Sequence, residues 1–343
     1  MTKDNPEKTD LMRNLKPAGY YLDSMSEFAD LLGTIKQAED AARELIDETS
    51  PQLPVSNTSA SEQETTVNEP TIEELLDNLD ALVGLSNIKQ SVRSLINYVK
   101  IRKLREENEL PNPPLSLHMV FTGNPGTGKT TVARILADLY RAIGVLSKGQ
   151  LIEVDRSGLV AGFVGQTAIK TTETVNSALG GILFIDEAYA LAPDTGGGND
   201  FGREAIETLL KMMEDHRNDL IVIVAGYSEP MARFIGANPG LESRFNRYFA
   251  FEDYNSEELL SIFNSMCAKS EYLLTDDAAD YALEHFTGIY EMRDENFGNA
   301  RHVRNFFENI VTVQSDRVSA LEDHTRESLT TVLLEDLHKA AIM

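Results

Sequence analysis

Short apolar runs alternate with helical stretches through the middle of this chain of 343 residues. Apolar residues recur at helical spacing from Thr71 to Val99, and four or five apolar runs follow, at Leu117–Thr122, Leu151–Asp155, Ile182–Asp186, Leu220–Ala225 and Tyr248–Phe251. Such runs are typical of strands that are buried on both faces. Because helices separate them, the strands need right-handed crossovers. The pattern therefore predicts a three-layer α/β sandwich with a parallel sheet, whose ligands bind at the carboxyl ends of the strands.

The spacing becomes helical only after Asp253. The predicted helices are Ser256–Lys269, Thr275–Tyr290, Ala300–Leu321 and a short Leu333–His338. At the other end of the chain, the apolar residues between Ser24 and Ile46 are spaced for a short helix or helical hairpin, and a stretch rich in Ser, Thr, Pro, Glu and Asn follows. We expect four parts: an N-terminal helical extension over 1–48, a flexible linker over 49–70, an α/β domain over 71–253 and a helical domain over 254–343.

Composition fits a globular protein, with 42% hydrophobic and 25% charged residues. The formal net charge of -24 opposes the counterion release that gives proteins affinity for nucleic acid, so DNA or RNA is an unfavoured partner. Cys267 is the single cysteine, which excludes a disulfide within the chain, and the first residues lack the apolar stretch of a secretory signal. No apolar run reaches the length of about 18 residues that a membrane span needs. We expect a cytoplasmic protein with no membrane insertion.

One glycine-rich segment carries the strongest chemical signal. The pattern G-x-x-x-x-G-K-T follows the first predicted strand and opens a helix, which is the context that a phosphate-binding P-loop requires. Its glycines allow backbone N–H groups to point at phosphate oxygens. Lys129 would contact the β and γ phosphates, and the Thr130 hydroxyl would coordinate Mg²⁺. The predicted nucleotide-binding residues of this segment are Gly123, Asn124, Pro125, Gly126, Thr127, Gly128, Lys129, Thr130 and Thr131.

Two carboxylates end the most apolar predicted strand, in the segment GGILFIDEA. A pair of acids there needs a compensating charge, which a bound Mg²⁺ supplies. Asp186 would hold the ion or one of its waters, and Glu187 would orient or deprotonate the attacking water. The sequence therefore predicts hydrolysis of a nucleoside triphosphate, with ATP and Mg²⁺ as cofactors.

Several longer segments resemble one family. VGLSNIKQSV, GNPGTGKTTVARILADLY, LVAGFVGQTAIKT, GGILFIDEAYALAP, NPGLESRF and GNARHVRN are similar to segments of AAA+ ATPases, and within them to the group of CbbX and stage V sporulation protein K. The resemblance extends from about Leu75 to the C-terminus. It implies an AAA+ α/β domain with a C-terminal helical lid.

The resemblance also implies roles for residues outside the P-loop. Val83 and Gly84 would lie beside adenine, and Arg301 would be the sensor-2 arginine that reaches from the lid to the nucleotide, with Arg304 as the alternative. Arg244 would be the arginine finger that stabilises charge at the neighbouring subunit's γ-phosphate, and Arg247 could share or take that role.

Three further positions follow from the same resemblance. Phe163, between Gly162 and Gly165, would be the aromatic residue of a pore loop, although a buried aromatic that anchors a turn is the alternative. Many AAA+ proteins carry a polar sensor-1 residue where this chain has Gly226 and Tyr227, and Tyr227 could either donate a hydrogen bond or simply pack. A second pore loop is expected within 194–200.

The function expected from these observations is that of a homo-oligomeric ring, as a hexamer, which remodels a protein client. Relatives in the resembling group act in Rubisco activation, sporulation or secretion, and residues 1–70 are expected to set the client. Two alternatives remain: a nucleic-acid motor or clamp-loader-like ATPase, and a slow-turnover scaffold controlled by ATP.

Overall fold

The computed structural model describes residues 70–113, 116–163, 165–192 and 201–343. They belong to one compact unit that spans Asn68–Met343. The helix expected between Ser24 and Ile46, the linker as far as 69 and the loop at 194–200 lie outside the described residues.

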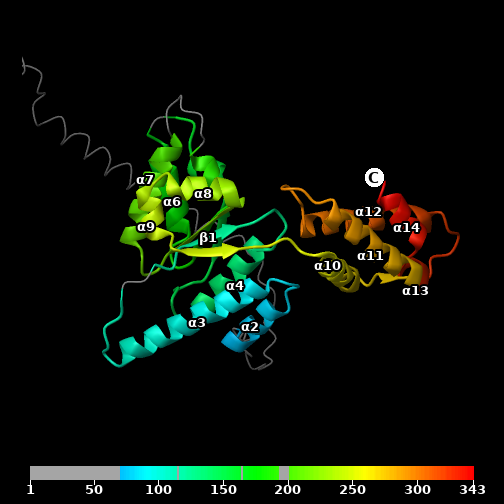
Figure 1. The fold of residues 1–343 in the computed structure, drawn as a ribbon, viewed down its shortest axis with the longest axis horizontal. Coiled ribbons are helices and arrows are strands. Elements are labelled where there is room, and N and C mark those ends of the chain that lie inside the picture. The colour runs from blue at the N-terminus through cyan, green and yellow to red at the C-terminus, as the bar shows by residue number, and fades with distance from the viewer. Residues whose placement is uncertain (1–69, 114–115, 164, 193–200) are drawn as a thin grey trace, which may run out of the picture. The chain divides into compact units, whose positions relative to one another are not determined.

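A five-stranded parallel sheet forms the centre of the α/β part. Figure 1 shows helices on both sides of it. Its strands, in spatial order, are β2 (Leu151–Val154), β3 (Ile182–Ile185), β4 (Ile221–Gly226), β1 (Met119–Thr122) and β5 (Arg247–Ala250). All five predicted strands are present, each within two residues of its predicted limits. The carboxyl ends of β1, β3 and β4 therefore meet at the same edge of the sheet.

Alternate side chains of the strands enter two separate cores, which is why the fold has three layers. Phe121 and Phe184 belong to the core beneath the first group of helices, whereas Val120 and Leu183 belong to the core beneath the second. The first group is α2 (Ile72–Asp80), α3 (Ser86–Glu107) and α4 (Lys129–Ala142). The second group is α5 (Arg156–Leu159), α6 (Thr167–Ser177), α7 (Phe201–Asp215), α8 (Ser228–Gly236) and α9 (Pro239–Arg244). The prediction of an α/β sandwich is confirmed.

The C-terminal part is a helical lid. It contains α10 (Ser256–Lys269), α11 (Asp276–Glu291), α12 (Ala300–Ser319), α13 (Arg326–Thr330) and α14 (Leu334–Ala340). Three aromatic rings, of Phe263, Phe286 and Phe306, pack in its core with centroids 5.5 to 5.9 Å apart. The expectation of helices alone was wrong in one detail, because β6 (Leu273–Leu274) and β7 (Thr331–Val332) pair as a parallel two-stranded sheet.

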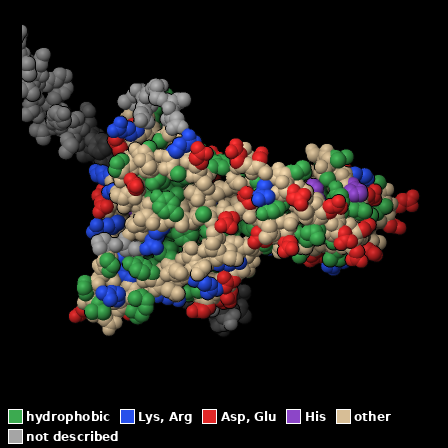
Figure 2. Space-filling model, in the orientation of Figure 1, with side chains coloured by type: hydrophobic (Ala, Val, Ile, Leu, Met, Phe, Trp, Pro, Cys, Tyr) green, Lys and Arg blue, Asp and Glu red, His purple; other side chains and the backbone are tan. Residues whose placement is uncertain are grey.

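The lid joins the sheet directly. The predicted boundary at 253 falls in the short segment between β5 and α10. Figure 2 shows acidic side chains gathered over the visible face of the lid, in keeping with the negative charge of the whole chain. Among the described residues, no helix is long and apolar enough to cross a lipid bilayer.

Candidate active site

The loop between β1 and α4 depends on glycine. Gly123, Gly126 and Gly128 have φ of 145°, 74° and 94°, a backbone region that favours glycine. A Cβ at Gly126 would also collide with the carbonyl oxygen of Gly298. No side chain caps α4, so the N–H groups of its first turn face the loop. This arrangement is a cradle for an anion.

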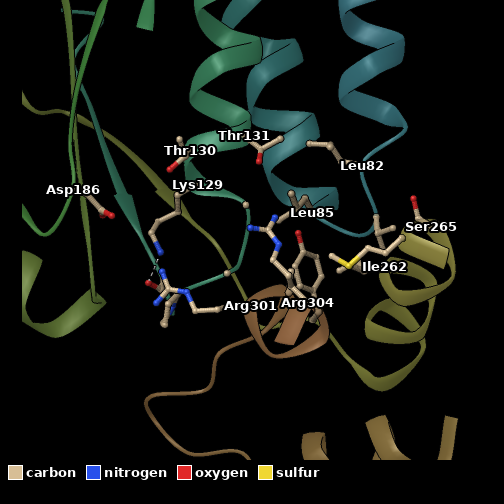
Figure 3. Close-up of a pocket in the computed structure, with 18 of the residues that line it drawn as sticks. Leu82, Leu85, Lys129, Thr130, Thr131, Asp186, Ile262, Ser265, Arg301 and Arg304 are labelled. Carbon is tan, nitrogen blue, oxygen red and sulfur yellow. Dashed lines mark hydrogen bonds between the residues drawn. The ribbon is translucent and has the colours of Figure 1, made fainter. Parts of the chain in front are cut away.

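Lys129 begins α4 and its side chain folds back over the loop. Its Nζ donates hydrogen bonds to the carbonyl oxygens of Gly123 at 2.9 Å and Asn124 at 2.8 Å (Figure 3). Burial lowers the pKa of Lys129 and the charge of Arg301 adds to that effect, while Asp186, Asp253 and Glu187 oppose it. The ammonium group thus lies in a partly desolvated position surrounded by charges of both signs.

Asp186 and Glu187 follow β3 at the same edge of the sheet. Glu187 has a positive φ of 47°, and its backbone N–H donates to Asp186 Oδ1 at 3.0 Å. This left-handed turn leads the chain away from the strand into the short 3-10 turn Ala188–Leu191. Both residues line the same cavity as Lys129, and the Glu187 side chain is exposed to it.

A third carboxylate lies beside Thr130. The Thr130 hydroxyl donates to Glu153 Oε1 at 3.3 Å, and Glu153 comes from β2, the strand next to β3. The hydroxyl expected at Mg²⁺ therefore has an acidic neighbour that the motifs did not reveal.

The cavity has a volume of about 480 Å³, within the range of small-molecule and cofactor sites. It brings together most of the predicted nucleotide residues, namely Val83, Gly123, Pro125, Gly126, Gly128, Lys129, Thr130, Thr131, Asp186, Glu187 and Arg301. Gly84, Asn124 and Thr127 do not line it. The buried Thr127 hydroxyl donates to the backbone carbonyl of Asn124 at 2.8 Å, so the Thr127 side chain holds the loop in shape.

The end of the cavity away from the carboxylates is apolar. Leu82, Val83 and Leu85 line it from the segment between α2 and α3, and Ile262 and Met266 line it from α10. Gly84 has a positive φ of 62°, and a Cβ there would collide with the Glu258 carboxylate. This turn places Val83 and Leu85, the apolar neighbours of Gly84, at the cavity. Their side chains form an apolar surface that suits a flat base.

Arg301 and Arg304 both enter from the start of α12. Figure 3 shows Arg301 nearer to Lys129 than Arg304 is. The charge of Arg301 contributes to the lowered pKa of Lys129. The geometry favours Arg301 over Arg304 at the phosphate end.

Tyr227 follows β4 and lines the cavity beside Gly226. Its ring centroid is 6.5 Å from that of Tyr189, and a Cβ at Gly226 would collide with the Tyr189 ring. Burial raises the pKa of Tyr189 to about 12, and the negative charge of Glu187 adds to that effect. Tyr227 thus lies at the cavity, where a hydroxyl donor is of use, but in contact with another ring.

Arg244 and Arg247 do not line this cavity. Arg244 ends α9, where it pairs with Glu214 at 3.5 Å and leaves its buried Nε without a hydrogen-bond partner. Arg247 Nε donates to the Ser116 carbonyl at 3.2 Å, and its guanidinium lies 5.7 Å from the Tyr98 ring centroid. Neither arginine reaches the nucleotide site of its own chain.

Phe163 is also remote from the cavity. It lies between α5 and α6 with 72% of its surface exposed. A Cβ added to Gly162 or Gly165 would meet no atom within 4 Å. This exposure is incompatible with the alternative of a buried aromatic anchor.

The parallel sheet, the phosphate cradle at its carboxyl edge and the helical lid define an AAA-type ATPase. Two family models match the chain: "ATPase family associated with various cellular activities (AAA)" over residues 119–253 and "AAA lid domain" over residues 255–342. The AAA domain of FIGL-1 in complex with ADP has the same fold, with a TM-score of 0.53 at 18% identity, over 76% of this chain and 82% of that one.

Curated relatives are much closer in sequence. A CfxQ homologue from Galdieria sulphuraria is 42% identical over 79% of this chain and 89% of its own length. Stage V sporulation protein K from Bacillus subtilis (strain 168) is 40% identical over 78% and 82%. The chloroplastic ribulose bisphosphate carboxylase/oxygenase activase of Cyanidioschyzon merolae is 41% identical over 81% and 95%. The chain belongs to the AAA ATPase family of CfxQ, CbbX and stage V sporulation protein K.

The sequence motifs did not predict three residues that shape the site, namely Glu153, Asp253 and Asn299. Asp253 accepts hydrogen bonds from the side chains of Asn124 and Asn299, which are 129 and 46 positions away in the sequence. The only sequence signals were an acid in a predicted strand, an acid at the domain boundary and the asparagine of GNAR.

Proposed function

We propose that this ATPase assembles into a homo-oligomeric ring, a hexamer by family resemblance, and remodels a protein client through its central pore. The exposed aromatic ring of Phe163 carries the proposal. A large apolar side chain that is 72% exposed between two unobstructed glycines has no packing role in the isolated chain. A loop of this kind suits contact with an extended polypeptide.

The cavity residues fit ATP and Mg²⁺. The cradle of bare backbone would hold the phosphates, and the Lys129 ammonium would exchange its two carbonyl partners for phosphate oxygens. Thr130 and Asp186 supply the oxygen ligands that Mg²⁺ prefers. The ion, when bound, would neutralise phosphate charge. Glu187, exposed at the cavity, would orient the attacking water and accept its proton.

Arg244 fits a role in a neighbouring subunit's site. It does not line its own cavity, so a contact with nucleotide requires a second copy of the chain. Its partner Glu214 is exposed, which leaves an ion pair that an approaching phosphate could replace. Arg247 is held by Ser116 and Tyr98, an arrangement that favours a structural role.

A protein is the client class that we propose. One relative is named an activase of ribulose bisphosphate carboxylase/oxygenase and another a stage V sporulation protein, so the two names share no single client. The negative charge of the chain opposes nucleic acid as a client. We also propose that the ring is cytoplasmic.

The test uses the Glu187→Gln variant, which should bind ATP without turnover and hold its client. The ring is isolated from native cells with ATP, and the bound molecules are identified. Glu187→Gln with Phe163→Ala is the matched control. Enrichment of one protein that Phe163→Ala abolishes would support the proposal. Enriched nucleic acid, or a protein whose capture does not depend on Phe163, would refute it.

A further inference from the structure

Asn299 lies just before the first residue of α12 in an uncommon backbone conformation. Its φ is 48° and its ψ is -129°, a region where glycine is favoured and other residues are strained. The residue is fully buried, and its side chain does not cap the helix that it precedes. Such strain persists only when the surrounding structure enforces it.

Three hydrogen bonds hold the Asn299 amide in place. Nδ2 donates to Asp253 Oδ1 at 2.7 Å and to the Phe297 carbonyl at 3.1 Å. Oδ1 accepts from the backbone N–H of Tyr254 at 2.9 Å. The amide therefore ties the start of α12 to the segment between sheet and lid.

Asp253 extends this chain of hydrogen bonds to the P-loop. The Asn124 side chain donates to both carboxylate oxygens of Asp253, at 3.0 and 3.1 Å. The Asn124 carbonyl in turn accepts from Lys129 Nζ at 2.8 Å. Side chains from the P-loop, the connecting segment and the lid thus form one network that ends at Lys129.

The backbones of the P-loop and the lid also touch. The N–H of Ala300 donates to the Gly126 carbonyl at 3.2 Å. A Cβ at Gly126 would collide with the Gly298 carbonyl oxygen, so the two segments approach as closely as their backbones allow. Arg301 follows two residues after Asn299 and enters the cavity from this contact (Figure 3).

We propose that Asn299 is a positioning residue, which together with Asp253 and Asn124 fixes the start of α12 against the P-loop and so places Arg301 at the phosphates. This inference rests on the proposed role of Arg301. A strained asparagine is poorly explained as a plain helix start, because glycine would adopt this φ and ψ without strain. Glycine at this position would lack the buried side-chain amide and its hydrogen bonds.

Asn299→Gly tests the network without adding backbone strain. The variant keeps an allowed conformation and removes all three side-chain hydrogen bonds. We expect thermal unfolding close to that of the parent protein, with ATP turnover and affinity for a fluorescent ADP both lowered by about 10- to 100-fold, because a misplaced binding group costs that much. Asn296→Ala, an exposed change in the same loop, is the control and should behave as the parent does.

The double variant with Arg301→Ala decides whether Asn299 acts through Arg301. Residues of one network are coupled, so Asn299→Gly should add little to the loss that Arg301→Ala causes alone. Fully additive losses would overturn the inference and leave the role of Arg301 intact. If Arg301→Ala alone changed neither turnover nor ADP affinity, the role of Arg301 and the inference would fail together.

Exchanging the side chains of Asn299 and Asp253 distinguishes loss of the network from a general loss of stability. Asn299→Asp places a carboxylate against Asp253 and should lower ADP affinity. Combining it with Asp253→Asn restores a donor opposite an acceptor, while residue 253 can still accept from Asn124. Partial recovery of ADP affinity in the pair is expected. No recovery, with both proteins folded, would contradict the network.

Discussion

Lys129 shows how the site is prepared for an anion before any ligand is bound. Burial disfavours its charged ammonium form, and its hydrogen-bond partners are two backbone carbonyls rather than a carboxylate. An arriving phosphate would add negative charge beside the ammonium group and raise the lysine pKa again. Binding of nucleotide is therefore favoured by relief of an unfavourable environment in addition to the new contacts.

Glu187 is expected to act in hydrolysis and not in binding. The Glu187 side chain is exposed at the cavity. The P-loop backbone and Lys129 would hold the phosphates, so Glu187→Gln should leave ADP affinity nearly unchanged. Loss of the base should lower phosphate release by about 100-fold or more. The measurement compares steady-state phosphate release with binding of a fluorescent ADP. Glu284→Gln, an exposed change on α11, is the control, and equal losses of binding and turnover would contradict this assignment.

His118 gives the protein an acid-sensitive point in the core. Its Nδ1 accepts from the Val222 N–H at 3.0 Å, and burial, aided by the charge of Arg244, lowers its pKa from 6.5 to about 4. Between these two values the unfolded chain binds a proton at this histidine and the folded chain does not. The free energy of unfolding therefore falls as the pH falls through this window, and the contribution of His118 is fully present above about pH 6.5.

The His118→Gln variant isolates this contribution. Its side-chain oxygen can still accept from Val222, but it does not titrate. Relative to the variant, the parent should lose about 2 kcal/mol of unfolding free energy between neutral pH and about pH 5. Urea unfolding at both pH values measures the difference. A difference in unfolding free energy between the two proteins that does not change with pH would rule out this explanation. His324→Gln, a change at an exposed site, is the control and should show the same pH dependence as the parent.

At the scale of elements, one ion pair joins α12, β7 and α14 of the lid. Arg317 on α12 donates to both oxygens of Asp336 on α14, at 2.9 and 2.8 Å, and to the Thr331 carbonyl of β7 at 3.0 Å. Asp336 is fully buried and also accepts from the N–H of Leu333. Removing the arginine would leave a buried carboxylate without its counter-charge.

Arg317→Met should therefore cost about 3 kcal/mol of unfolding free energy. Arg326→Met offers a matched control, because the pair of Arg326 and Glu271 is 85% and 74% exposed and should contribute less than about 1 kcal/mol. Urea unfolding of the two variants gives the comparison. Equal losses would show that burial of this pair does not matter to the lid.

The elements were predictable from the sequence to different degrees, for physical reasons. Fully buried strands such as β3 appear as apolar runs, and α10 begins where its helical spacing begins. The two-residue strands β6 and β7 are too short to show any period. The P-loop was readable because one segment carries all its chemistry. The partners of Asp253 and Asn299 are brought together only by the tertiary fold.

At the scale of the whole molecule, the proposed role of Arg244 makes the site of one chain incomplete. The described cavity contains a phosphate cradle, two carboxylates and Arg301, but Arg244 lies elsewhere on the surface of the sheet domain. An arginine that serves a neighbour's nucleotide requires a head-to-tail contact, and such contacts close into rings when the rotation allows it. ATP turnover should therefore depend on protein concentration.

Mixing two inactive variants tests this arrangement directly. Arg244→Ala keeps an intact cavity and lacks the arginine, whereas Glu187→Gln keeps the arginine and lacks the base. If the arginine acts across the subunit contact, an Arg244→Ala subunit beside a Glu187→Gln subunit regains a complete site. Random mixing in equal amounts should then recover about a quarter of the parent's rate of phosphate release, because half of the sites keep the base and half of their neighbours keep the arginine. Recovery with Arg247→Ala in place of Arg244→Ala would assign the role to Arg247, and no recovery with either would mean that neither arginine acts on a neighbour.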